Sequence, residues 1–76
     1  MDAIEALILS LPAEGDRIRR LFWRDPEFRT VCEDYRDALE AKARYEPRDP
    51  ARAEEYRQLA VELLAEAAGR LKGETP

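Results

Sequence analysis

Apolar side chains recur every third or fourth position along most of this chain, which is the spacing of an α-helix that buries one face. The pattern divides into four stretches, at about 2–10, 16–24, 26–45 and 50–71. Proline and glycine separate the first two stretches, and each of the two long stretches begins with an Asp-Pro pair, a typical helix start. Alanine is abundant and glycine is rare, which also favours helix over sheet. The sequence therefore predicts an all-α fold.

The two long stretches carry matching apolar faces. In the third stretch the face spans an arc of about 120°, the width expected of a helix that packs on a core. It consists of Phe28, Val31, Cys32, Tyr35, Ala38 and Leu39. The face of the fourth stretch consists of Ala53, Tyr56, Ala60, Leu63, Leu64, Ala67 and Leu71, with Leu59 at its margin. Because only a short turn joins these helices, we predict an antiparallel helical hairpin (helices about 26–45 and 50–71) with a short two-helix N-terminal arm.

The length of 76 residues allows one small domain. Within it we assign residues 1–24 to the N-terminal arm, 25–72 to the hairpin and 73–76 to a frayed tail. A domain of this size buries only about 60–65% of the surface that its unfolded chain exposes, so its core is thin. A single cysteine and the lack of histidine exclude an intrachain disulfide and a zinc framework as reinforcement. Stability must therefore come from regular helix packing or from self-association.

Charge and hydropathy narrow the possible partners. The chain carries 13 basic and 17 acidic residues, a formal net charge of −4, whereas proteins that bind nucleic acid through its phosphates are normally basic. The apolar run 3–11 contains Glu5 and is too short to cross a membrane. It also has neither the basic start nor the cleavage pattern of a signal peptide. We therefore expect a cytoplasmic protein without a membrane partner, in which the lone thiol stays reduced.

The outer face of the third stretch carries opposite charges four residues apart. The pairs are Arg29–Glu33, Arg36–Glu40 and Glu40–Arg44. Side chains at this spacing meet on the surface of a helix, and each such pair adds a few tenths of a kcal/mol. We therefore expect a solvated face held by ion pairs.

Residues suited to catalysis or metal binding are scarce. No histidine is present as a general base, and Cys32 lies inside the apolar face, where we predict a small buried hydrophobic side chain. The carboxylates available for a di-metal helical bundle are Glu33, Asp37, Glu62 and Glu66. They lie off the apolar faces and have no histidine partners, and no glycine-rich phosphate loop or calcium loop occurs. We predict that the chain is not an enzyme and uses no cofactor, metal or small-molecule substrate.

One set of positions, spread over most of residues 10–71, matches a known pattern. It comprises Pro12, Ile18, Leu21, the run Asp25-Pro26-Glu27-Phe28, Tyr35, Leu39, Arg44 and Glu46. In these residues the chain resembles the YdcH-like small helical proteins of bacteria, although Lys42 stands where that family tends to place a branched apolar residue. The resemblance implies a helical hairpin with an uncharacterised role, and it supplies no catalytic residues.

The second stretch carries the one cluster of positive charge in the chain. Its members are Arg17, Arg20 and Arg24 on one side of the helix and Arg19 and Trp23 on another. Arginines around an exposed tryptophan form a possible partner-binding surface, because both residue types are enriched in interface hot spots. In the alternative interpretation, Trp23 folds back onto the hairpin and the arginines pair with Asp34 and Asp37. The sequence leaves both interpretations open.

Two functional hypotheses follow from these surfaces. The first is a non-enzymatic protein-interaction module that self-associates through its helices, because one hairpin need not cover Leu59, Val61, Trp23 and the face Ile4–Leu11. Lys42 lies at the centre of an otherwise apolar face and is a candidate for setting the register of a homo-oligomer. The alternative is an adaptor that docks on an acidic protein or on nucleic acid through the Arg-rich N-terminal arm.

Overall fold

The computed structural model describes residues 1–73, and this part of the chain is helical throughout apart from its short connections. Its elements are α1 (Ala3–Ser10), the 3₁₀ turn η1 (Pro12–Glu14), α2 (Gly15–Arg24), α3 (Pro26–Tyr45) and α4 (Pro50–Lys72). The predicted all-α class is therefore confirmed, with four α-helices among the described residues. The predicted frayed tail falls mostly on residues 74–76, which lie outside the described residues.

An aspartate side chain caps the N-terminus of α1, of α3 and of α4. In α3, Oδ1 of Asp25 accepts hydrogen bonds from the backbone N–H groups of Glu27 at 3.0 Å and Phe28 at 3.3 Å. In α4, Oδ1 of Asp49 accepts from the N–H of Arg52 at 3.1 Å. Asp2 caps α1 in the same way. Each cap satisfies backbone donors that a helix leaves unpaired at its start, which is worth about 1 kcal/mol.

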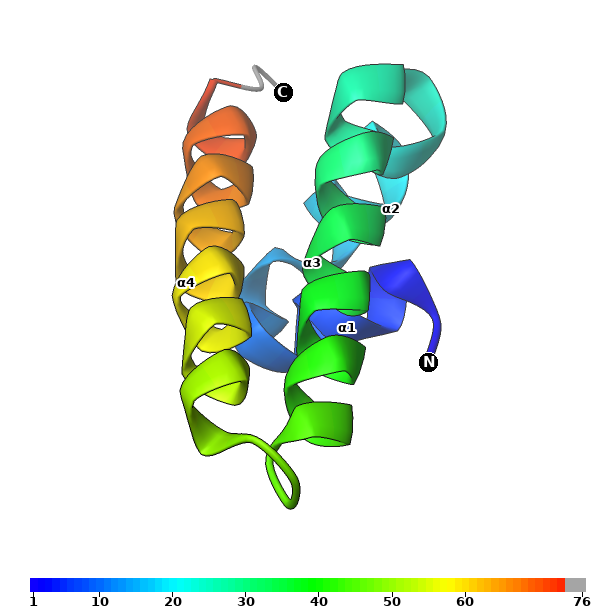
Figure 1. Ribbon diagram of the computed structural model, residues 1–76. Helices are drawn as coiled ribbons and strands as arrows, with labels where there is room; N and C mark the ends of the chain where they lie inside the picture. The colour runs from blue at the N-terminus through cyan, green and yellow to red at the C-terminus, as the bar shows by residue number, and fades with distance from the viewer. Residues whose placement is uncertain (74–76) are drawn as a thin grey trace.

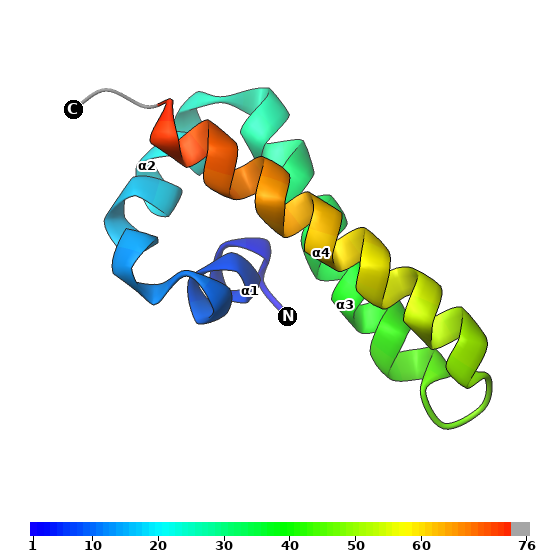
Figure 2. The same cartoon turned by 90° about the vertical axis from the view of Figure 1, so that its left-hand side faces the viewer.

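The long helices α3 and α4 lie side by side and are joined by the turn at 46–49 (Figure 1). The helices α1 and α2 lie across one side of this pair, near the end where α3 begins (Figure 2). The molecule is elongated, with extents of 44 × 22 × 19 Å. As a result, the end of the pair that carries the turn projects beyond α1 and α2 (Figure 2).

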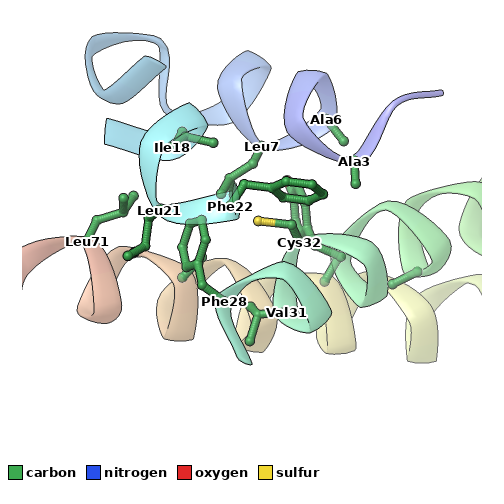
Figure 3. Close-up of a cluster of buried hydrophobic side chains, with 14 residues drawn as sticks. Ala3, Ala6, Leu7, Ile18, Leu21, Phe22, Phe28, Val31, Cys32 and Leu71 are labelled. Atoms are coloured by element: carbon green, nitrogen blue, oxygen red, sulfur yellow. The ribbon is translucent and has the colours of Figure 1, made fainter. Parts of the chain in front are cut away.

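Side chains from all four helices meet in one apolar cluster (Figure 3). The largest fully buried side chains are Phe28, Leu7, Ile18 and Cys32. All four come from α1, α2 or the first half of α3, so the bulk of the core lies where the N-terminal helices cover α3. The hydroxyls of Ser10 and Tyr35 share a hydrogen bond of 2.6 Å, which ties the end of α1 to the middle of α3.

The expectation that the face Ile4–Leu11 stays uncovered is wrong. Ala6 and Leu7 are fully buried, and Ile4, Ile8 and Leu11 are partly buried against the core. The reason is that α1 lays this face directly on α3, where its apolar side chains leave water together with those of α2.

Toward the turn, the contact between α3 and α4 is built from small and aromatic side chains. Ala38, Ala41, Ala53 and Ala60 are buried there. The rings of Tyr45 and Tyr56 stack at 5.7 Å with an angle of 7° between their planes. Small side chains let two helices approach closely, and they add little side-chain volume to the buried contact.

Lys42 does not occupy the centre of the buried face. The face that α3 turns toward α4 continues through Ala38 and Ala41, and Lys42 lies at its margin with 31% of its side chain exposed. Its ammonium group donates to Oε2 of Glu46, one turn further along the same helix, at 3.2 Å. The charge is therefore paired within α3 and held at the surface, as expected for a long side chain whose stem lies on apolar surface.

Candidate functional site

An open groove of about 350 Å³ runs between α3 and α4 on the half of the pair nearer the turn. Its walls are Asp34, Asp37, Ala38, Ala41 and Arg44 from α3 and Tyr56, Leu59 and Leu63 from α4. No residue of α1 or α2 lines it. The groove therefore belongs to the part of the helix pair that the N-terminal helices leave uncovered.

The groove presents apolar surface to solvent. Ala38 and Ala41 are buried and form its floor, and Leu63 is partly buried. Leu59 remains 43% exposed, as the sequence analysis anticipated. An exposed leucine beside an alanine floor is the kind of surface that a second protein can cover with a gain in hydrophobic free energy.

Asp34 and Arg44 are charged residues that line the groove, and neither has an ion-pair partner among residues 1–73. The predicted pair Glu40–Arg44 does not form, because Oε2 of Glu40 accepts instead from the amino group of Met1 at 3.0 Å. The third charged wall, Asp37, accepts from Nε of Arg36 at 3.0 Å. The groove thus has an acidic end and a basic end on the same helix.

The predicted pair Arg29–Glu33 does not form either. Nε of Arg29 donates to the carbonyl of Phe22 at 3.0 Å, and its guanidinium also reaches the carbonyl of Trp23 at 3.4 Å. Arg29 therefore closes the corner between α2 and α3, because the carbonyls at the end of a helix are otherwise short of donors.

The groove was not predicted from the sequence. A signal for it was present, because Asp34, Ala38, Ala41 and Arg44 follow one another at intervals of three or four and so share one side of α3. Two alanines between opposite charges are not a recognised motif, and the same residues also fit an ordinary solvated face. Only the position of α1 and α2 shows that this side stays open.

The five predicted partner-binding residues all lie on α2, and Trp23 is 71% exposed. Its ring meets that of Phe22 edge-on, with centroids 5.0 Å apart. The alternative interpretation, in which Trp23 folds back onto the hairpin, is therefore wrong: Phe22, one residue earlier, takes the inward position and turns Trp23 outward.

The positive charge on α2 is partly compensated within the N-terminal segment. Arg17 lies 3.5 Å from a carboxylate oxygen of Glu14, and Arg19 lies 4.0 Å from Asp16. Both pairs are one turn apart on exposed surface, where such pairs are worth little. The alternative interpretation required the arginines to pair with acids of α3. Arg17 and Arg19 instead pair with Glu14 and Asp16.

The one thiol is inert. Cys32 is fully buried between α1, α2 and α3, as predicted, and burial raises the pKa of its thiol to about 12. A thiol that stays protonated is a poor nucleophile and a poor metal ligand. Within residues 1–73 no three His, Cys, Asp or Glu side chains come together in a way that could hold a metal ion.

None of the helices described in residues 1–73 combines the length and the apolar character needed to cross a membrane. Fold and surface together define a small all-α protein with an open helical groove on one half and an exposed tryptophan among arginines on the other. Comparisons with protein-family models, with curated proteins and with solved structures find no match in any of the three. The resemblance to the YdcH-like proteins therefore stays a prediction.

Proposed function

We propose that this chain is a non-enzymatic protein-interaction module that self-associates through the open side of its antiparallel helical hairpin, α3 and α4. The observation that carries the proposal is Leu59, which is 43% exposed beside an apolar groove that no helix among residues 1–73 covers. Self-association would bury this leucine together with Tyr56 and Leu63, and burial of apolar area contributes about 25 cal/mol per Å².

The distribution of the core supports the same proposal. At the end where α3 begins, α1 and α2 form a second layer over the pair and bury its large side chains. Near the turn no helix of residues 1–73 lies over the pair, and the buried side chains are alanines. A second copy would supply the missing layer for a domain whose size leaves little stability to spare.

The proposal also covers the cellular compartment and the cofactor requirement of the protein. The module would work in the bacterial cytoplasm, without a cofactor. Its resemblance to the YdcH-like proteins supports a bacterial source, and a single cysteine outside any disulfide fits that compartment. It would use no reacting group, since the buried thiol of Cys32 has a raised pKa.

Sedimentation equilibrium over a wide range of micromolar concentrations tests the proposal. We expect the molar mass to rise from the 8.8 kDa of the monomer toward a multiple of it as concentration increases. Leu59→Glu should keep the protein monomeric, because it places a charge in the surface to be buried. The matched control is Leu9→Glu, which changes a leucine that is 75% exposed on α1, away from the groove. A wild-type protein that stays monomeric throughout would refute self-association.

A second candidate function is favoured by the 71% exposure of Trp23 among the arginines of α2. In this alternative the chain is an adaptor that binds an acidic protein, or nucleic acid, through Arg17, Arg19, Arg20, Trp23 and Arg24. A fluorescent poly-glutamate peptide and a labelled oligonucleotide serve as probes. The adaptor predicts binding that weakens with salt and that Arg20→Glu and Trp23→Ala both abolish, while circular dichroism shows an intact fold. Binding that ignores salt and both substitutions would exclude it.

A further inference from the structure

The two unpaired charges of the groove point to a specific partner. We propose that the groove holds a second copy of this chain, related by a two-fold axis, so that Asp34 of each copy pairs with Arg44 of the other. The inference rests on the proposed function, which supplies self-association, and adds to it the face, the symmetry and the register of the dimer.

Charge complementarity is the first argument. Asp34 and Arg44 lie ten residues apart on α3, about 15 Å along the helix, at opposite ends of one groove. A two-fold axis perpendicular to α3 reverses the direction of the second copy, which brings its basic end to the acidic end of the first. The same pair then forms twice, as in any isologous interface. A parallel arrangement would instead place like charges together.

Neighbouring side chains differ at the two ends of the groove. Asp37 stands one turn from Asp34, but Arg36 already pairs with its carboxylate at 3.0 Å, so Asp34 supplies the open negative charge of the acidic end. At the basic end, the guanidinium of Arg52 lies 5.1 Å from the ring centre of Tyr45, which stacks on Tyr56 in the groove wall. The polarity of the groove therefore rests on Asp34 and Arg44, and Arg52 adds positive charge near the basic end.

The position of Leu59 is the second argument. The midpoint between Asp34 and Arg44 falls at residue 39 of α3. The register of the helix pair follows from two contacts, because Arg70 reaches Glu27 at 3.2 Å and Tyr56 stacks on Tyr45. In this register the α4 residues opposite position 39 are 58–62, a range that includes Leu59. The exposed Leu59 thus lies near the level of the proposed axis, where it would meet the same leucine of the second copy.

The shape of the face is the third argument. Ala38 and Ala41 lie on either side of the midpoint, and their small side chains allow two α3 helices to approach closely. A stable interface buries about 800 Å² on each partner. The molecular extents of 44 and 22 Å give one long side of the molecule room for such an area.

Complementary charge reversals test the inference, with sedimentation equilibrium and native mass spectrometry as readouts. The variants Asp34→Arg and Arg44→Asp each place two like-charge pairs across the interface, so each should dimerise roughly tenfold to a hundredfold more weakly than wild type. Mixed in equal amounts, they should form a heterodimer, because both pairs are then again of opposite charge. The double variant should likewise recover the homodimer.

Charge reversals away from the groove serve as controls. Glu5→Arg on α1 and Lys72→Asp at the end of α4 make the same changes of charge at exposed positions and should leave dimerisation unchanged. Circular dichroism should show an unaltered helix content for all variants, since Asp34 and Arg44 are both exposed.

The outcomes separate this inference from the function on which it rests. Recovery of the dimer in the mixture supports the two-fold pairing. A wild-type dimer that neither reversal weakens, or single variants that stay monomeric when mixed, would overturn this pairing while self-association stands. A wild-type protein that is monomeric at every concentration would overturn both, and it would leave the groove to a different protein.

Discussion

At the end where α3 begins, the helix pair buries Phe28 and Cys32 against Leu7 of α1 and Ile18 of α2. At the end that carries the turn, the same two helices bury alanines at 38, 41, 53 and 60, and the stacked rings of Tyr45 and Tyr56 stay half-buried. The covered end thus has two layers of helix and a core of large side chains. The turn end has one layer, and close backbone approach replaces side-chain volume there.

This difference explains where an interaction surface can lie. The covered end has already paired its apolar faces within the chain, and its large exposed apolar side chains, such as Leu9 on α1 and Trp23 on α2, lie on separate helices. The turn end keeps a groove with Leu59 at its edge. A face that the fold leaves without a second layer remains available to another molecule.

The largest expected effect is on the covered end. Phe28→Ala should lower the free energy of unfolding by about 3–5 kcal/mol, because it removes a fully buried ring and leaves a cavity. Urea denaturation followed by circular dichroism measures this loss; the emission of Trp23 is a poor probe because that side chain is already 71% exposed. Tyr45→Ala, at the half-buried turn end, should cost less than half as much. Equal losses would show that the two ends are packed alike.

A smaller change in stability is expected from a substitution that tests whether α3 and α4 pack closely at the turn end. Ala60→Leu adds volume at a buried position in α4 and should destabilise the protein by about 1–3 kcal/mol through overpacking. The control is Ala65→Leu, an exposed position in the same helix, where the change should be near zero. If Ala60→Leu were stabilising, the helices at this end would have room to spare.

Removing a helix cap should lower the free energy of unfolding by a still smaller amount. The region in which hydrogen exchange speeds up should differ between the two ends. Asp49→Ala takes away the acceptor for the N–H of Arg52 and should cost about 1 kcal/mol. Because few large side chains anchor the start of α4, hydrogen exchange should speed up mainly in its first turn. Asp25→Ala removes a similar cap beside Phe28, where exchange should rise across the core instead. Identical exchange patterns would contradict this distinction.

The ionisation of the Cys32 thiol in the covered end should leave stability unchanged near neutral pH and lower it only at alkaline pH. Burial raises the pKa of Cys32 from 9.0 to about 12, so the folded protein keeps the thiol neutral while the unfolded chain loses its proton above pH 9. The stability that this group contributes is complete below pH 9 and is lost as the pH rises from 9 to 12. The free energy of unfolding should therefore fall more steeply in this window for wild type than for Cys32→Ala, and parallel curves would refute it.

Local signals in the sequence were sufficient for most of the fold. The Asp-Pro starts at 25–26 and 49–50 predicted where the long helices begin, because a cap and a proline act within one turn of chain. The helical period of apolar residues predicted the burial of Phe28, Val31 and Cys32 in α3. These properties depend on neighbours three or four residues away, which one sequence displays.

Which of several possible ion-pair or hydrogen-bond partners a charged side chain binds could not be predicted from the sequence in this way. Arg29 and Glu40 each have an oppositely charged residue four positions away, yet Arg29 binds the end of α2 and Glu40 binds the amino group of Met1. The choice depends on which distant group the fold brings within reach. The same holds for Lys42, whose position relative to the buried face depends on the side from which α4 approaches α3.

The sequence by itself therefore determined that this chain is helical, where its long helices begin, and most of the side chains that these helices bury, because capping and helical period are local. Only the tertiary structure decided that α1 and α2 cover one end of the pair and leave the other open, that Trp23 points outward, and that Asp34 and Arg44 share a groove with Leu59. The physical reason is that these properties depend on how whole helices are placed, and many placements bury the same apolar stripes.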